Sequence, residues 1–191
     1  MKIDFSNKIV LITGGTRGIG AAIVKLFQQC NANIIATGTN IDELEKLNKE
    51  SKINKTNYYY LDFTTVDSVK DFFKYINKLD VIDVLINNAG VNKIDPINKV
   101  SEIDWDWINN INLKGPFLLT KEVSKIMQKT RSGKIVNISS IFSTVSKAKR
   151  ASYSTTKWGL IGLTKALALD LISCNILVNA VSPGFVDTEL T

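Results

Sequence analysis

Short apolar runs alternate with amphipathic helical stretches along the chain, and this alternation restricts the fold more than any other feature of the sequence. Six of these runs are rich in β-branched or aromatic residues and have the length of buried strands. They are Lys8 to Thr13, Asn33 to Thr37, Asn57 to Leu61, Ile82 to Asn87, Lys134 to Ser139 and Ile176 to Val181. No hairpin turn signal joins two of them, so we expect parallel strands connected by right-handed helical crossovers.

Apolar residues at helical spacing fill the intervals between these runs. The expected helices cover Ile19 to Cys30, Ile41 to Glu50, Val66 to Ile76, Ile108 to Met127 and Tyr153 to Leu171. We therefore predict an α/β fold, a doubly wound parallel sheet of the Rossmann type in a three-layer sandwich, with strand order 3-2-1-4-5-6. The 191 residues contain no linker, repeat or low-complexity segment, so one domain is expected over residues 1–191.

Composition excludes several classes of partner and site. The net charge is +6, but the lysines are scattered rather than gathered in a basic stripe, which argues against nucleic-acid binding. No apolar run approaches the roughly 20 residues that span a bilayer. The first residues lack a signal-peptide pattern, so a cytoplasmic location is expected. The chain has no histidine and only two cysteines, Cys30 and Cys174, so neither a metal site nor a disulfide framework is expected.

A glycine-rich turn joins the first run to the first helix. Glycine adopts turn conformations that other residues avoid and lets the backbone approach a ligand closely. The free amides at the start of the helix favour a pyrophosphate, although a purely structural strand–helix turn is the alternative. We expect a dinucleotide to contact Thr13, Gly14, Thr16, Arg17, Gly18, Ile19 and Gly20.

The spacing Thr-Gly-x-x-x-Gly-x-Gly in this turn resembles the short-chain dehydrogenase/reductase family, and the resemblance runs from Lys8 to Thr191. The segment Asn87-Asn88-Ala89-Gly90 is similar to a family motif that supports the sheet and borders the adenosine. The resemblance implies an adenine contact after the third strand and a nicotinamide-side segment after the sixth. The additional cofactor contacts that it implies are Asp62, Phe63, Asn88, Ala89, Gly90, Pro183, Gly184 and Thr188.

The end of the second strand bears on the choice of cofactor. NAD sites usually place an acidic residue there, where it binds the ribose 2′-hydroxyl. Here the residues from Ala36 to Asn40 include no carboxylate, and the next acid is Asp42. The guanidinium of Arg17 is suited to a 2′-phosphate, and a solvated turn residue is the alternative. We therefore expect NADP(H), with NAD(H) left open.

Four polar residues have the spacing of the family's Asn-Ser-Tyr-Lys tetrad, namely Asn112, Ser140, Tyr153 and Lys157. The resemblance implies that Tyr153 is the general acid or base and that Lys157 tunes it and holds the nicotinamide ribose. Ser140 would bind the substrate oxygen and Asn112 would anchor a water. Each could instead be structural: a solvated lysine, a strand-end cap or a helix irregularity. Ser139 is the rival of Ser140, but strand alternation points the two side chains to opposite faces.

The chemistry of hydride transfer agrees with this set of residues. Reducing a carbonyl builds negative charge on oxygen, which needs a proton donor and hydrogen bonds. A free tyrosine has a pKa near about 10. We expect the ammonium of Lys157 and the cationic nicotinamide ring to lower the pKa of Tyr153.

Two hypotheses about function follow. The first is an oxidoreductase that transfers a hydride between NADP(H) and a carbonyl or secondary alcohol, resembling the 3-oxoacyl-[acyl-carrier-protein] reductases. The second is a truncated dinucleotide-binding protein with little or no turnover and a structural or redox-sensing role. Family members continue several tens of residues further, whereas this chain stops at Thr191, so we expect the C-terminal lid and a seventh strand to be missing.

Surface residues suggest two partners. A basic loop before Tyr153 could steer an acidic carrier protein that bears an acyl thioester, although a solvated loop is the alternative. Its basic residues are Lys147, Lys149 and Arg150. The outward faces of the two longest expected helices carry apolar side chains, which predict a homodimer. These side chains are Leu118, Trp158 and Ile161.

Overall fold

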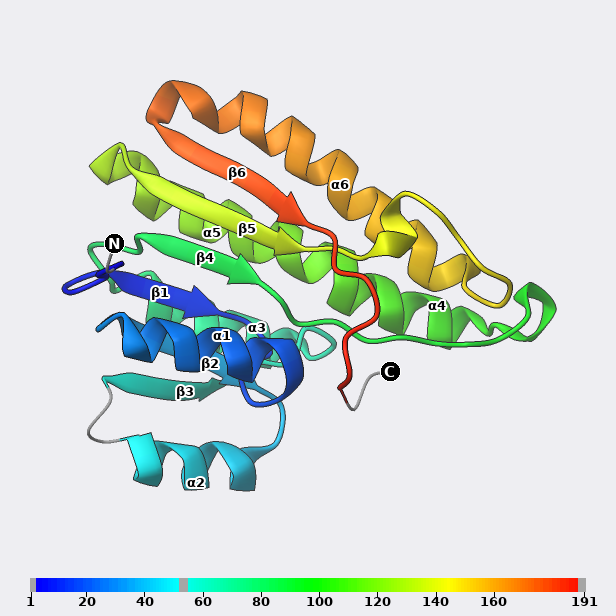
Figure 1. Cartoon of the computed structure of the whole chain (residues 1–191), viewed down its shortest axis with the longest axis horizontal. Coiled ribbons are helices and arrows are strands. Elements are labelled where there is room, and N and C mark those ends of the chain that lie inside the picture. Colours follow the sequence, from blue (N-terminus) through cyan, green and yellow to red (C-terminus); the bar gives the residue numbers. More distant parts are fainter. Residues whose placement is uncertain (1–2, 52–54, 189–191) are drawn as a thin grey trace.

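The computed structural model describes residues 3–51 and 55–188. Among these residues, six strands form one parallel sheet in the order β3-β2-β1-β4-β5-β6, as the sequence predicts. In Figure 1 the arrows lie side by side and point toward the same end of the molecule. The strands are β1 (Ile9–Ile12), β2 (Asn33–Gly38), β3 (Thr56–Tyr60), β4 (Val84–Asn87), β5 (Gly133–Ile138) and β6 (Ile176–Val181).

Helices connect the strands and cover the sheet, which confirms the doubly wound arrangement (Figure 1). They are α1 (Gly18–Gln29), α2 (Ile41–Glu50), α3 (Val66–Ile76), α4 (Glu102–Asn109), α5 (Gly115–Thr130) and α6 (Ala151–Leu171). The bounds of α2, α3 and β6 are those that the sequence predicts. None of the described helices is long and apolar enough to cross a membrane.

The core lies on both faces of the sheet, because successive side chains of a strand point in opposite directions. Leu11 of β1 packs in one buried cluster with side chains of α3, α5 and the end of α6. Its neighbours Val10 and Ile12 pack on the opposite face with Val24 of α1 and Leu44 of α2. These three of the four residues of β1 are fully buried, which explains why the run is apolar throughout rather than alternating.

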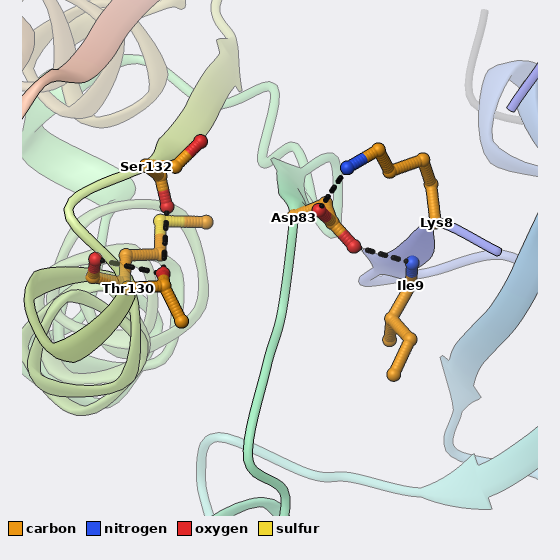
Figure 2. Close-up of polar contacts among 6 residues, drawn as sticks. Lys8, Ile9, Asp83, Thr130 and Ser132 are labelled. Atoms are coloured by element: carbon orange, nitrogen blue, oxygen red, sulfur yellow. Dashed lines mark hydrogen bonds and ion pairs between the residues drawn. The ribbon is translucent and has the colours of Figure 1, made fainter.

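Asp83 ties the beginnings of β1 and β4 together. Its Oδ1 accepts a hydrogen bond of 2.9 Å from Lys8 Nζ, and its Oδ2 accepts one of 2.8 Å from the backbone N of Ile9 (Figure 2). Figure 2 also shows the hydroxyl of Thr130 at the end of α5, which donates to the carbonyl of Ser132 just before β5. These contacts lie at the amino-terminal ends of β1, β4 and β5. The candidate functional residues lie at the opposite, carboxyl ends of the strands.

The region predicted as one helix over Ile108 to Met127 differs from that expectation. A π-helical segment, Asn110–Lys114, separates α4 from α5. Pro116, in the first turn of α5, has no amide hydrogen to donate to the preceding turn, and such positions suit the start of a helix. The apolar spacing of the sequence does not distinguish a π-helical turn from α-helix. Such single turns are frequent at functional sites, and Asn112 lies in this one.

Candidate active site

A cavity of about 920 Å³ lies where β1 to β5 end, at the carboxyl edge of the sheet. Ligands of open α/β sheets bind at this edge. Its lining includes fourteen of the residues that the sequence analysis expects to contact a cofactor. They are Gly14, Thr16, Arg17, Gly18, Ile19, Gly20, Asp62, Phe63, Asn88, Ala89, Gly90, Tyr153, Lys157 and Thr188.

The glycine turn leaves the start of α1 open to this cavity. Gly14 and Gly18 have φ angles of +63° and +54°, in the left-handed region that residues with a Cβ rarely adopt. A Cβ added at Gly20 would collide with the carbonyl oxygen of Gly14. Arg17 occupies the N-cap position of α1, and its side chain does not cap the helix. The backbone amides at the start of α1 therefore fit an anion such as a pyrophosphate.

Thr13 and Asn88 hold the turn against the end of β4. The Thr13 hydroxyl accepts hydrogen bonds of 3.0 Å from the backbone N atoms of Asn88 and Ala89. In return, Asn88 Nδ2 donates to the carbonyl oxygens of Thr13 (2.9 Å) and Gly14 (3.0 Å). Thr13 is 1 % exposed and does not line the cavity, so its contribution is to position the residues that do.

Asp62 presents a fixed carboxylate where β3 ends. Its Oδ1 accepts hydrogen bonds from the backbone N (2.8 Å) and hydroxyl (2.7 Å) of Thr64. On the neighbouring wall, Asn40 Oδ1 accepts a 3.1 Å bond from the backbone N of Glu43 and begins α2. Glu43 also lines the cavity. The sequence analysis did not predict this, because it considered only the residues from Ala36 to Asn40 as positions for an acid. A helical residue three positions after the cap returns to the same side as the cap, and this signal could have found it.

Ser140 acts on Tyr153 through a side-chain hydrogen bond that lowers the pKa of the tyrosine. Ser140 lies two residues after the end of β5, and its Oγ accepts a 3.2 Å bond from the backbone N of Phe142. The ring of Phe142 meets the Tyr153 ring edge-on, with centroids 6.1 Å apart. The hydroxyl of Ser139 points elsewhere and donates to the backbone carbonyl of Lys157 at 3.1 Å. Ser139 lines the cavity and Ser140 does not, so the choice of Ser140 over Ser139 stays a prediction.

Lys157 is a buried lysine in the wall of the cavity, with 4 % of its surface exposed. Its Nζ lies 5.7 Å from the centre of the Tyr153 ring and donates a 2.9 Å bond to the carbonyl of Ile138. Burial lowers the pKa of Lys157 to about 8, because the charged amine loses its hydration. This amine is therefore not a solvated helix lysine.

The pKa of Tyr153 differs from the expectation. Burial raises it above its ordinary value, while the hydrogen bond from Ser140 and the positive charge of Arg150 lower it in part. In the chain alone the raising effect is the larger. Burial is a tertiary property, and the residue spacing from which the lowering was expected does not contain it.

Asn112 is fully buried, and its side-chain amide binds protein groups. Its Oδ1 accepts from the backbone N of Val91 at 2.8 Å, and its Nδ2 donates to the Val91 carbonyl at 2.9 Å and the Thr156 hydroxyl at 3.2 Å. The side chain thus ties the π-helical segment both to the chain after β4 and to α6. A water held by Asn112 stays a prediction, and both side-chain donors are already used.

The sequence pattern described as short chain dehydrogenase (adh_short) matches residues 8–191. The chain belongs to this family. The 3-oxoacyl-[acyl-carrier-protein] reductase FabG of Aquifex aeolicus is 39% identical over 195 residues, which cover 100% of this chain and 79% of that protein. The reductase of the same name from Thermotoga maritima is 41% identical over 188 residues, 97% of this chain and 76% of its own.

Solved structures of the family have the same fold as this short-chain dehydrogenase. A 4-hydroxyisoleucine dehydrogenase complexed with NADH superposes with a TM-score of 0.90 at 34% identity, over 97% of this chain and 76% of that one. A metagenomic short-chain oxidoreductase in complex with NADP gives 0.87 at 31% identity, over 95% and 83%. The protein is an NAD(P)-dependent oxidoreductase of this type, and its cofactor is a nicotinamide dinucleotide.

Some predicted residues of this short-chain dehydrogenase do not line the cavity. They are Thr13, Asn112, Ser140, Pro183 and Gly184. The first three position their neighbours through the hydrogen bonds given above, and the carbonyl of Pro183 accepts a 2.8 Å bond from the backbone N of Ile141. Thr188 does line the cavity and lies over the glycine turn, where a Cβ added at Gly18 would be 3.5 Å from Thr188 Cγ2. Contact of Pro183 and Gly184 with the cofactor stays a prediction.

The cavity also has apolar walls that the motifs did not indicate. Val91 and Trp107 pack against the buried cluster of Ile108, Phe142 and Tyr153, and both line the cavity beside the tyrosine. Their only sequence signal is position, since Val91 directly follows Gly90 and Trp107 precedes the π-helical segment. Among the described residues, no group of histidine, cysteine or acidic side chains could hold a metal ion.

Proposed function

We propose that this short-chain dehydrogenase transfers a hydride between NADP(H) and a carbonyl or secondary alcohol, with Tyr153 as general acid or base. The observation that carries the proposal is the position of Tyr153 in the cavity wall, with Lys157 Nζ 5.7 Å from the centre of its ring. These groups can hold an oxygen and move a proton at the edge of the cavity. A binding protein without turnover has no use for a tyrosine held in this way, so the catalytic hypothesis is favoured.

The residues present fit a nicotinamide dinucleotide. The glycine turn has no Cβ where Gly14 and Gly20 face close neighbours, and the open start of α1 suits a pyrophosphate. Asp62 would meet the adenine, and Lys157 would hold the nicotinamide ribose. When bound, the dinucleotide supplies or accepts the hydride.

Side chains of the protein then supply or accept the proton. In the direction of reduction, the Tyr153 hydroxyl donates its proton to the substrate oxygen while the Ser140 hydroxyl donates a hydrogen bond to that oxygen. In the direction of oxidation, Tyr153 must first lose its proton. Burial opposes this loss and the hydrogen bond from Ser140 assists it. A charged Lys157 favours the tyrosinate further, because opposite charges at this distance attract.

The preference for NADP(H) rests on Arg17 and on the acid-free segment from Ala36 to Asn40. Arg17 lines the cavity together with Thr39 and Asn40. Glu43 also lines it and opposes a 2′-phosphate through its negative charge. We propose that the guanidinium of Arg17 outweighs it, since it can form charge-assisted hydrogen bonds to the phosphate.

Turnover with a panel of ketones and aldehydes, followed by the loss of NADPH absorbance, tests the proposal. The matched variant is Tyr153→Phe, which removes the hydroxyl and keeps the ring against Phe142. We expect its rate to fall by about 10²- to 10⁴-fold while NADPH still binds. A retained rate would show that another group supplies the proton. Tight NADPH binding without turnover by the unaltered protein would favour the binding-only alternative.

An acyl thioester on a carrier protein is a second candidate substrate, favoured by the names of the FabG relatives. Lys147 and Lys149 are exposed in the loop before α6 and could attract an acidic carrier. Reversing both charges should slow the reaction with a carrier-bound 3-oxoacyl thioester about tenfold at low salt and spare a small neutral ketone. Equal effects on both substrates would reject this role.

We also propose that two copies associate through α5 and α6. Trp158 of α6 is 52 % exposed, whereas Leu118 and Ile161 are half-buried. A second, apolar groove of about 330 Å³ lies nearby, between the π-helical segment and these helices. Its lining is Asn109, Leu113, Lys114, Phe117 and Leu163. Burying such a surface against a second copy would remove apolar area from water.

A further inference from the structure

Arg150 differs from the two other basic residues of its loop. Lys147 and Lys149 are exposed, whereas Arg150 is half-buried with its Cζ 5.5 Å from the centre of the Phe142 ring. Its Nη1 is buried and has no hydrogen-bond partner. Over residues 3–51 and 55–188, no carboxylate forms an ion pair with this guanidinium. A buried, unpaired donor of this kind is costly, and functional sites are where such groups occur.

The place of Arg150 on α6 puts it beside the reacting groups. Arg150, Tyr153 and Lys157 lie at intervals of three and four residues and so share one face of the helix. Arg150 and Lys157 are about 10 Å apart along the helix axis, with Tyr153 between them. Phe142 contacts both Arg150 and Tyr153. The guanidinium of Arg150 lies over its ring, and the ring of Tyr153 meets it edge-on.

Arg150 and Lys157 lie at opposite ends of the site, with Tyr153 between them. Lys157 lines the cavity that fits the dinucleotide, whereas Arg150 does not line it and lies on the other side of Tyr153. A substrate oxygen at the Tyr153 hydroxyl would therefore have the cofactor toward Lys157. The rest of the substrate would extend toward Arg150. The positive charge of Arg150 reaches this point, since it lowers the pKa of Tyr153.

We propose that Arg150 binds a carboxylate of the substrate, so that this dehydrogenase acts on oxo acids or hydroxy acids with a free carboxylate a few bonds from the reacting carbon. The guanidinium is a planar group that pairs with a carboxylate through two parallel hydrogen bonds. Such a substrate would give the buried Nη1 its partner. Contact with Phe142 restricts the guanidinium before binding. The inference rests on the proposed hydride transfer and selects among the substrates left open there.

A pair of substrates that differ only in charge tests the inference. The reduction of 3-oxobutanoate is compared with that of its neutral methyl ester, in the unaltered protein and in Arg150→Gln. We expect the unaltered protein to prefer the acid in kcat/KM by about ten- to hundred-fold, and the variant to lose this preference through a higher KM for the acid. Arg150→Lys should keep part of the preference, since it keeps the charge without the planar fork. Lys147→Gln, in the same loop, should keep all of it.

Several outcomes would overturn the inference while hydride transfer stands. One is an ester reduced as well as the acid, and another is an equal loss of both reactions in Arg150→Gln. A preference for the N-acetylcysteamine thioester of the same acid would assign the substrate to the carrier-bound class instead. If neither compound nor any ketone of the panel is reduced while NADPH still binds, the proposed function itself fails, and the inference fails with it.

Discussion

Lys157 Nζ donates a hydrogen bond of 2.9 Å to the backbone carbonyl of Ile138, at the last residue of β5. The bond holds the amine in the wall of the cavity, where burial lowers its pKa to about 8. At neutral pH the folded protein therefore keeps a charged amine largely out of water, which opposes folding. The position of this lysine therefore does not serve stability.

Lys157→Met should stabilise the protein. The pKa of Lys157 is about 8 in the folded chain against an ordinary value of 10.5, a difference worth about 3 kcal/mol. Below pH 8 the full destabilising effect is present, and it is lost as the pH rises from 8 to 10.5, because only the unfolded chain then binds the proton. Urea unfolding at pH 7 should show a gain of about 2 to 3 kcal/mol, with loss of turnover.

The control for this prediction is Lys165→Met, at an exposed position of the same helix. Its free energy of unfolding should change by less than about 0.5 kcal/mol at either pH. A destabilised Lys157→Met, or a gain that does not shrink toward alkaline pH, would contradict the assignment.

Ser140→Ala should move the pH dependence of alcohol oxidation to higher pH. The hydrogen bond from Ser140 lowers the pKa of Tyr153, so its removal raises that pKa and delays formation of the tyrosinate. The rate below the midpoint should fall as well. Ser139→Ala removes a bond to the backbone of Lys157 and should leave the midpoint unchanged. A profile that moves only in Ser139→Ala would reverse the roles of the two serines.

Arg17→Ala should weaken NADPH binding selectively. Loss of charge-assisted hydrogen bonds to the 2′-phosphate should raise the Kd for NADPH by about ten- to hundred-fold and leave that for NADH within about twofold. Nicotinamide fluorescence titration measures both constants. If the unaltered protein binds NADH as tightly as NADPH, the preference proposed from Arg17 is wrong. The NADPH and NADH affinities of Glu43→Gln should then be measured as well, because this variant removes a carboxylate that lines the cavity.

Gly20→Ala should harm both stability and cofactor binding. The added Cβ would collide with the carbonyl oxygen of Gly14 and would lie 2.5 Å from Asn88 Nδ2, so the glycine turn must shift. We expect a loss of about 1 to 3 kcal/mol in the free energy of unfolding. Gly162→Ala is the control, since a Cβ there has nothing within 4 Å, and it should be neutral or stabilising by up to about 1 kcal/mol. Thermal melts with and without NADPH distinguish the two variants.

Phe117→Glu should separate the proposed dimer. Phe117 is 46 % exposed and lines the apolar groove beside α5 and α6, where a carboxylate would be desolvated on association. Sedimentation velocity at micromolar concentration should show a dimer for the unaltered protein and a monomer for the variant. Leu26→Glu, at an exposed apolar residue of α1 on the opposite face of the sheet, should leave the dimer intact. A monomeric unaltered protein would rule out this interface.

The strands and most helix bounds could be predicted from the sequence because they depend on local periodicity, and the strand order follows from the doubly wound fold class that the alternation of strands and helices indicates. The fully buried run of β1 and the helical spacing of α3 are visible without any knowledge of their neighbours. The exception is the π-helical segment around Asn112. Its side chain binds Val91, 21 residues earlier in the chain, and no local pattern reports that partner.

The sequence by itself therefore determined the parallel α/β fold, the glycine turn and the residues of the candidate tetrad, since motif spacing and residue type carry all three. Only the tertiary structure decided how burial changes the pKa of Tyr153 and Lys157. It also separated Arg150 from the exposed lysines of its loop, by placing its guanidinium over Phe142. The physical reason is that desolvation and long-range contacts depend on which distant segments pack around a side chain, and spacing along the chain does not contain that information.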